Sequence, residues 1–142
     1  MLITIVVMLA SLLACTPQQP AAGDQVTEKI KVGLSFSDFG TERWKNEEIL
    51  LKKLLEDKGY EVLSYQADQD VKLQNEQIDK MVSQGVKSLI VVPQDGDAVV
   101  TSVDNAAQSG VKVLSYDRLI KSSKVAAYIS FNNVEVGRPA KP

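Results

Sequence analysis

Two pairs of neighbouring residues combine side chains that could bind a ligand rich in hydroxyl groups. Asp117 and Arg118 follow one apolar segment, and Arg43 and Trp44 lie near the start of an expected helix. Carboxylate and guanidinium groups can each make two charge-assisted hydrogen bonds to adjacent hydroxyls, and an indole covers an apolar C–H face. A helix-capping role would explain Asp117 but not its neighbour Arg118. These four residues therefore indicate a sugar as the ligand.

An alternative remains open for the aromatic pair. A large ring near the open end of a sheet has little core to enter, which favours a contact with ligand. Trp44 could instead pack on the domain surface beside a solvated Arg43.

The residue inventory excludes several kinds of catalytic site. The chain has no histidine, and its only cysteine is Cys15, so Ser-His-Asp and Cys-His nucleophile systems and the usual zinc sites cannot be assembled. No G-x-G-x-x-G or Walker A phosphate loop occurs, and only a carboxylate pair could still do acid–base chemistry. The net charge of −2 is spread along the chain without a basic stripe. We expect no enzyme, metal, cofactor or nucleic-acid partner.

The first residues look like a targeting segment. Residues 1–14 are an apolar run too short for an ordinary transmembrane helix, and Leu12-Leu13-Ala14-Cys15 resembles a bacterial lipobox, in which the cysteine is acylated. We expect residues 1–15 to be a lipoprotein signal peptide with Cys15 as the lipidated residue. No Lys or Arg precedes Lys29, so the usual basic start is missing. A cleaved signal peptide with an incidental cysteine, or a buried N-terminal strand, remains possible.

The next segment, residues 16–28, is rich in Pro, Gln, Gly and Ala. Such a composition cannot bury much apolar surface and is typical of a flexible tether. A lipid on Cys15 would hold the following domain close to a membrane.

From Lys29 the chain alternates short apolar segments with helical patterns. The expected strands are 30–36, 60–65, 88–92, 111–116 and 125–131, and the expected helices are 41–58, 71–84 and 95–109. Within the first helix, Leu51, Leu54 and Leu55 share a face with Lys58. The third strand is a continuous apolar run, typical of a strand that is buried on both faces.

Three glycines support this division, because Gly59, Gly85 and Gly110 each end a helix and lead directly into a strand. The regular spacing predicts an α/β fold, a doubly wound parallel sheet with right-handed crossovers. Ligands of such sheets bind beyond the carboxyl ends of the strands. Polar residues follow all five expected strands: Ser37-Asp38, Gln66 to Asp68, Gln94-Asp95, Asp117-Arg118 and Asn132-Asn133. Such residues also cap helices, and we assign Asp95 to capping.

These residues carry a family resemblance. The segments KVGLSFSDFGTERWKNEEILLKKLLEDKGYEVL, QIDKMVSQGVKSLIVVPQDGDAV, AAQSGVKVLSYDRLI and AAYISFNNVEVG resemble the N-terminal lobe of sugar receptors of the periplasmic-binding-protein-like I family. Within that family they are most similar to D-xylose-binding proteins. The specific markers are Glu42-Arg43-Trp44 and Tyr116-Asp117-Arg118. The resemblance assigns residues 29–137 to one sugar-binding lobe.

The resemblance implies a substrate-binding lipoprotein for a monosaccharide, D-xylose above all, in an ABC-type sugar uptake system. It implies that Arg43 and Trp44 contact the pyranose, that Asp117 and Arg118 bind its hydroxyls, and that Asp38 is a weaker candidate at the same rim. The implied partners are an ABC permease or a membrane sensor protein. The implied location is the cell envelope outside the cytoplasm, anchored to the cell membrane by lipid, and the periplasm in a Gram-negative cell.

The chain departs from the family pattern in residues 138–142, read as a truncated tail. Pro139 falls where the family continues in a long helix, and a proline there costs about 3 kcal/mol or more. We therefore expect the second lobe to be missing and sugar binding by this chain to be weak. Two other functions stay open: a sugar-sensing half-receptor that pairs with a membrane sensor kinase, and a small α/β enzyme of flavodoxin-like build.

Overall fold

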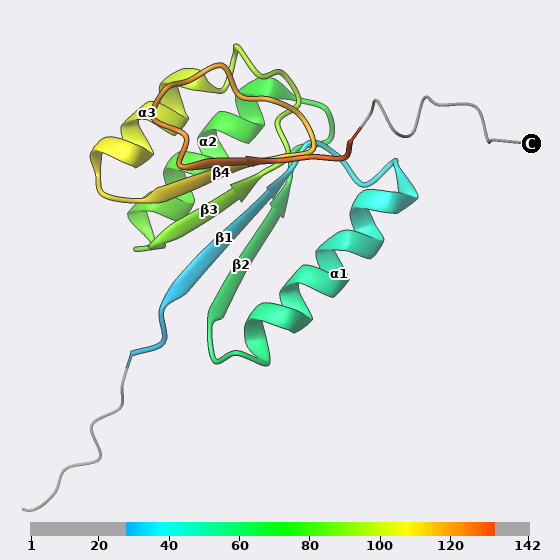
Figure 1. The fold of residues 1–142 in the computed structure, drawn as a ribbon, viewed down its shortest axis with the longest axis vertical. Coiled ribbons are helices and arrows are strands. Elements are labelled where there is room, and N and C mark those ends of the chain that lie inside the picture. Colours follow the sequence, from blue (N-terminus) through cyan, green and yellow to red (C-terminus); the bar gives the residue numbers. More distant parts are fainter. Residues whose placement is uncertain (1–27, 133–142) are drawn as a thin grey trace, which may run out of the picture.

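Five parallel strands form the sheet at the centre of the computed structural model, which describes residues 28–132 (Figure 1). Their order across the sheet is β2-β1-β3-β4-β5. The strands are β1 (Lys31–Phe36), β2 (Glu61–Gln66), β3 (Ser88–Val91), β4 (Lys112–Tyr116) and β5 (Ala127–Ile129). The predicted α/β fold with a parallel sheet is confirmed. Because all strands run the same way, their carboxyl ends meet at one edge of the sheet.

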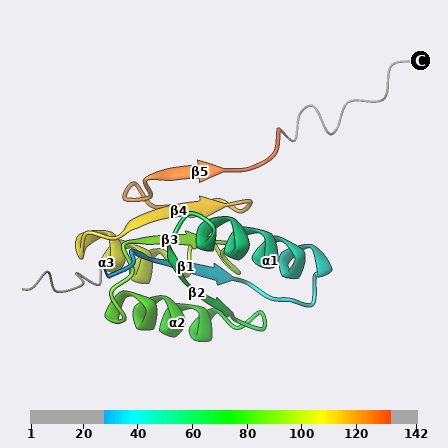
Figure 2. The same cartoon turned by 90° about the horizontal axis from the view of Figure 1, so that it is seen from below.

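Three helices cover the two faces of this sheet: α1 (Glu42–Glu56), α2 (Val71–Ser83) and α3 (Val100–Gln108) (Figure 2). One face packs against α2 and α3 through a core that includes Ile78, Met81 and Val103. The other face packs against α1 through a smaller core that includes Leu34 and Phe36. Alternate residues of β1 supply the two faces, as the pleat of a strand requires.

The glycines that were predicted to end the helices have the backbone conformation that this role needs. Gly59, Gly85 and Gly110 have φ angles of +89°, +84° and +85°. The left-handed region costs glycine no steric strain, so each helix can stop and reverse into the next strand.

The third helix is shorter than predicted, because it begins at Val100 rather than near Asp95. The Asp95 carboxylate accepts hydrogen bonds from the backbone N–H groups of Asp97 (2.8 Å) and Ala98 (2.9 Å). Asp95 therefore caps a turn that precedes the helix. The fifth strand is also shorter than predicted, with three residues instead of seven.

Two burial predictions are wrong, and they share a cause. Leu54, expected on the buried face of α1, is 48% exposed, although Leu51 and Leu55 do pack on the core. Ile90 in β3 is only half-buried, although its neighbours Leu89 and Val91 are buried. Among the described helices only α1 lies on this face, and it packs chiefly over β2. The part of the face over β3 and β4 therefore stays open within residues 28–132.

Several predictions concern residues outside the described range. These are the signal peptide (1–15) with Cys15, nearly all of the tether (16–28) and the tail (138–142). Within residues 28–132, no helix has the length and apolar character needed to cross a membrane.

A buried glutamine joins α2 to the carboxyl ends of two strands. Gln74 is fully buried, and its amide NH₂ donates to the Val92 carbonyl (3.0 Å) and to the Ser35 hydroxyl (3.2 Å). Its amide oxygen accepts from the backbone N–H of Gln94 (2.8 Å). This side chain thereby fixes the loop that follows β3.

We expect Gln74→Leu to lower the free energy of unfolding by about 2 to 4 kcal/mol, because it leaves two backbone groups without partners at about 1–3 kcal/mol each. Urea unfolding monitored through the single tryptophan, Trp44, measures the change. Glu76→Leu on the exposed side of the same helix is the control and should change the value by no more than about 0.5 kcal/mol. Equal effects of both variants would contradict a structural role for Gln74.

Candidate functional site

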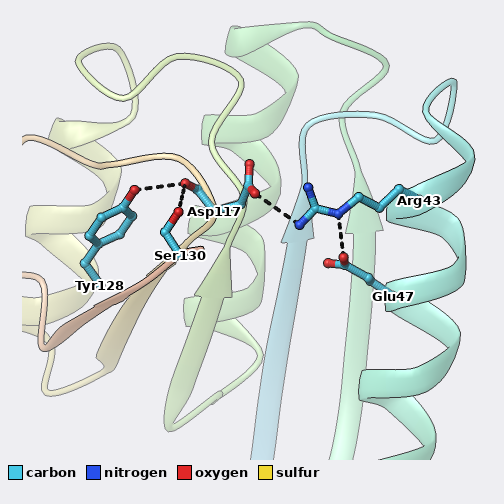
Figure 3. A network of polar contacts seen from close by, with 5 residues as sticks. All are labelled: Arg43, Glu47, Asp117, Tyr128 and Ser130. Atoms are coloured by element: carbon cyan, nitrogen blue, oxygen red, sulfur yellow. Dashed lines mark hydrogen bonds and ion pairs between the residues drawn. The ribbon is translucent and has the colours of Figure 1, made fainter. Parts of the chain in front are cut away.

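An ion pair joins the start of α1 to the end of β4 at the carboxyl edge of the sheet (Figure 3). Arg43 Nη2 lies 3.0 Å from Asp117 Oδ1. The guanidinium carbon of Arg118 lies 5.9 Å from the centre of the Trp44 ring. The four residues singled out in the sequence therefore come together, and we call the region around Arg43, Asp117 and Arg118 the mouth.

Contacts on several sides fix the Arg43 guanidinium. Its Nε donates to Glu47 Oε1 (2.6 Å), one helical turn further along α1. Its carbon lies 4.3 Å from the centre of the Trp44 ring and 4.6 Å from that of Phe131, within the range of cation–π attraction. Burial alone would lower the pKa of Arg43, but hydrogen bonds and charges from Glu47 and Asp117 outweigh it and raise this pKa. The mouth therefore contains a permanently charged and immobilised donor.

Asp117 has a strained backbone that β5 supports. Its φ of +62° lies in the left-handed region, which is unusual for a residue with a side chain. Its carbonyl accepts hydrogen bonds from the Tyr128 hydroxyl (3.0 Å) and the Ser130 hydroxyl (3.1 Å), and its N–H donates to the Ile129 carbonyl (2.8 Å) (Figure 3). Residues held in such conformations are concentrated at binding and catalytic sites.

Arg118, which follows β4, is tied both to the loop after β3 and to β4. Its Nη1 donates to the Pro93 carbonyl (3.1 Å), and its own carbonyl accepts from the Ser115 hydroxyl (2.6 Å). The residue is nevertheless exposed to solvent. Its side chain is therefore both positioned and open to a ligand.

The expectation that Trp44 has little core to enter is wrong. Trp44 is 3% exposed and packs against Leu34, Phe36 and Val92, so it is part of the smaller core. The alternative of a ring packed on the surface is wrong as well. Within the described residues its buried Nε1 has no hydrogen-bond partner. In this structure the indole supports Arg43 from below and does not present an open face to the mouth.

Asp38, the weaker candidate, has a structural role in this structure. Its carboxylate is buried and accepts hydrogen bonds from the Thr41 backbone N–H (2.9 Å) and the Ser37 hydroxyl (3.0 Å). The hydrogen bond from the Thr41 N–H lowers the pKa of Asp38 most, and the Ser37 hydroxyl and Arg118 charge lower it further against the opposing effect of burial. Asp38 thus fixes the turn that leads into α1.

Two residues of the mouth were missed in the sequence. Glu47 is four positions after Arg43, a spacing that predicts an ion pair on a helix, so a signal was present. Phe131 was assigned to a strand, yet it lies beyond β5, is 54% exposed and contacts Arg43. Tyr116, at the end of β4, packs against the smaller core that contains Trp44, and burial and then Glu47 raise the pKa of its hydroxyl.

The arrangement is suited to binding rather than to catalysis. It places two guanidinium groups and two carboxylates beside aromatic rings, and such groups recognise hydroxyls through charge-assisted hydrogen bonds. In residues 28–132 no group of histidine, cysteine, aspartate or glutamate side chains could hold a metal ion. The guanidinium and carboxylate groups of the mouth could therefore bind a polar ligand directly.

A parallel sheet with a polar mouth at its carboxyl edge is the architecture of an α/β binding lobe. The profile of the family described as "Periplasmic binding protein domain" matches residues 32–140. The chain belongs to this family.

Relatives agree with this assignment. Over 110 residues, the chain is 34% identical to the D-xylose-binding periplasmic protein of Escherichia coli (strain K12), covering 78% of the chain and 33% of that protein. An ABC transporter solute-binding protein from Clostridium phytofermentans with bound β-D-glucose superposes with a TM-score of 0.73 at 37% identity, covering 75% and 33% of the two chains. The Caulobacter myo-inositol-binding protein superposes with a TM-score of 0.69 at 28% identity, covering 76% and 37%.

The chain spans about a third of the length of these relatives. These relatives are described as binding proteins.

We expect Asp38→Ala to lower the free energy of unfolding by about 1 kcal/mol at pH 7, because the turn that leads into α1 loses the hydrogen bond from the Thr41 N–H. Because the folded pKa of Asp38 is lowered, its ionised form stabilises the fold above the unfolded pKa of about 3.9, and this stabilisation is lost as the pH falls through the folded value. The difference from wild type should therefore shrink below about pH 4.

Urea titrations at a series of pH values measure this difference. The exposed Asp79→Ala is the control. A difference for Asp38→Ala that stays constant down to the acid transition would contradict the role of the Asp38 charge.

Proposed function

We propose that the chain is the sugar-binding lobe of a substrate-binding lipoprotein in an ABC-type sugar uptake system, with a monosaccharide such as D-xylose at the mouth. The observation that carries this proposal is the joining of Arg43, Asp117 and Arg118 at the carboxyl edge of the sheet. In this function the residues bind the ring hydroxyls, and no residue is catalytic.

The mouth retains hydrogen-bond groups for a sugar. Only one carboxylate oxygen of Asp117, Oδ1, contacts Arg43, so Oδ2 can accept from a ligand hydroxyl. Arg118 uses one guanidinium nitrogen, Nη1, for the Pro93 carbonyl, and its other nitrogens can donate to hydroxyls. Several such contacts must act together, because each unpaired hydroxyl in a closed site costs about 1–3 kcal/mol.

Trp44 and Phe131 differ in what they can offer to a ring. Phe131 is exposed at the mouth, and Trp44 is covered. For the indole to stack on a sugar, as we expect from the sequence, its surroundings would have to move. We keep Trp44 in the proposed site because its ring supports the Arg43 guanidinium, and Asp38 contributes through the turn that leads into α1.

The identity of the sugar rests on the relatives. Two relatives are named for D-xylose, and two solved structures are described with D-glucose and myo-inositol. All three ligands are six-membered rings that carry several hydroxyl groups. D-xylose is our first choice because two of the curated relatives carry that name.

The second candidate function is a sugar-sensing half-receptor that pairs with a membrane sensor kinase. It is favoured by the similarity, at 28% identity and a TM-score of 0.67, to a fructose-binding periplasmic domain of a hybrid two-component system. If the chain binds the ectodomain of a sensor kinase and not a permease, this second function is favoured over the uptake system.

The proposed organisation has residues 29–137 as the lobe and residues 16–28 as a tether, with a lipid on Cys15. This arrangement would place the lobe outside the cytoplasm and close to the membrane that holds the permease. Acylation supplies the membrane attachment in this proposal.

We expect the chain to bind D-xylose with a dissociation constant no tighter than about 1 mM, because one lobe supplies only part of the hydrogen bonds of a closed site. Addition of the sugar should shift the backbone NMR signals of Arg43, Asp117 and Arg118. Arg118→Ala should abolish these shifts, and Lys45→Ala, on the first turn of α1, should retain them. Shifts that persist in Arg118→Ala would remove Arg118 from the site, and micromolar affinity would indicate that a second chain completes the site.

We expect labelled palmitate to be incorporated into the protein in bacterial cells and to be lost in Cys15→Ala. The thiol is the acceptor of the lipid, and it is the only one in the chain. Immunoprecipitation and autoradiography measure incorporation. Equal labelling of both proteins would refute anchoring through Cys15.

A further inference from the structure

The two edges of the sheet differ in charge. Aspartates follow the carboxyl ends of four strands, whereas lysines gather where β1, β3 and β4 begin. The lysines at the latter edge are Lys29, Lys31, Lys87 and Lys112, and we call them, with Ile30, the basic end. The net charge of −2 for the whole chain does not predict such a surface.

Backbone hydrogen bonds bring the starts of β1, β3 and β4 together, so Lys31, Lys87 and Lys112 form a row along this edge, although Lys112 pairs with Ser88 rather than with Lys87. The N–H of Lys87 donates to the Lys31 carbonyl (2.8 Å), and the N–H of Lys112 donates to the Lys87 carbonyl (3.0 Å). Neighbouring strands are about 4.8 Å apart, and like charges directly opposite each other, as at Lys31 and Lys87, destabilise a sheet. A row of this kind therefore favours an anionic partner.

Few acidic groups neutralise the row. Lys31 lies 3.9 Å from Glu28, whose side chain is 87% exposed, and it also donates to the Gln84 carbonyl (3.4 Å). Glu61 begins β2 opposite Lys31, at one end of the row. Within residues 28–132, Lys29, Lys87 and Lys112 make no ion pair.

Apolar surface accompanies the lysines. Ile30, between Lys29 and Lys31, is 54% exposed. A groove of about 440 Å³ opens beside it, with an apolar lining that includes Ile90 and Leu114. Lys87 and Lys112 also line this groove. A second hollow, of about 200 Å³, is lined by Lys29, Lys31 and Lys87 among others.

We propose that the basic end binds the surface of an anionic phospholipid bilayer. Lysines attract the phosphate-bearing headgroups, and exposed aliphatic side chains enter the boundary between headgroups and acyl chains. The combination of both kinds of residue at one edge fits a lipid surface better than it fits a nucleic acid, which needs no apolar contact.

The position of the basic end in the chain supports a membrane as the partner. Residue 28 lies beside Lys29, so the proposed tether joins the lobe at this edge. Its thirteen residues, 16–28, cannot span more than about 45 Å even when fully extended. A lipid on Cys15 would therefore keep the basic end close to the headgroups. This argument rests on the proposed anchoring, whereas the charge and apolar surface of the basic end do not.

Lysine labelling tests the proposal on the full chain. The chain is mixed with vesicles of phosphatidylcholine alone or of phosphatidylcholine with 30% phosphatidylglycerol, isolated by flotation, and treated briefly with an amine-reactive reagent. Mass spectrometry then gives the labelling rate of each lysine. We expect the rates of Lys87 and Lys112 to fall at least threefold on the anionic vesicles and to recover in high salt, which screens the attraction. Lys45 and Lys72, in the first turns of α1 and α2 and away from the basic end, should not change.

A pair of charge-matched variants provides the second arm. Lys87→Glu/Lys112→Glu should remove the protection of Lys29 and Lys31, and Lys45→Glu/Lys72→Glu should retain it. The proposal is overturned if the chain floats with neither kind of vesicle, if protection is equal on both kinds, or if the two double variants behave alike. Sugar-dependent NMR shifts at the mouth and palmitate incorporation at Cys15 are independent readouts, so a failure here is distinguishable from a failure of the proposed function.

Discussion

The ion pair between Arg43 and Asp117 is the contact on which the rest of the mouth depends. It joins the first turn of α1 to the end of β4, two elements that are separated by more than 70 residues in the chain. Glu47 holds Arg43 from within α1, and β5 holds Asp117 through its backbone. A charged pair that is held from both sides keeps its geometry without a ligand, which reduces the entropy that binding must overcome.

The two aromatic residues that contact Arg43, Trp44 and Phe131, differ in their exposure to solvent. Trp44 is buried in the smaller core and lies under Arg43, while Phe131 is exposed on the solvent side. The guanidinium thus lies between two aromatic rings, each within the range of cation–π attraction. The mouth is consequently an extension of the hydrophobic core, and a change in that core would alter the position of a binding residue.

The sequence was sufficient for the architecture and for the charged residues Arg43, Asp117 and Arg118 of the mouth, but not for Glu47 and Phe131. Helix-ending glycines and the alternation of apolar segments predicted the parallel sheet, and strand ends predicted that Asp117 would lie near Arg43. Burial was harder to predict, because it depends on which helix covers which part of a face. Leu54 and Ile90 had apolar patterns typical of core residues, yet α1 leaves them exposed or half-exposed. The contact between Phe131 and Arg43 depends on the path of the chain after β5, for which the sequence carries no local signal.

The support that β5 gives to Asp117 has a consequence for local stability. β5 is a strand of three residues at the edge of the sheet, and all three of them are exposed. Short edge segments open more readily than central strands, since few contacts must break. Fraying of β5 would release the carbonyl and N–H of Asp117 and allow its strained backbone to relax. Hydrogen exchange at the mouth should then follow the opening of this edge, well before the lobe unfolds as a whole.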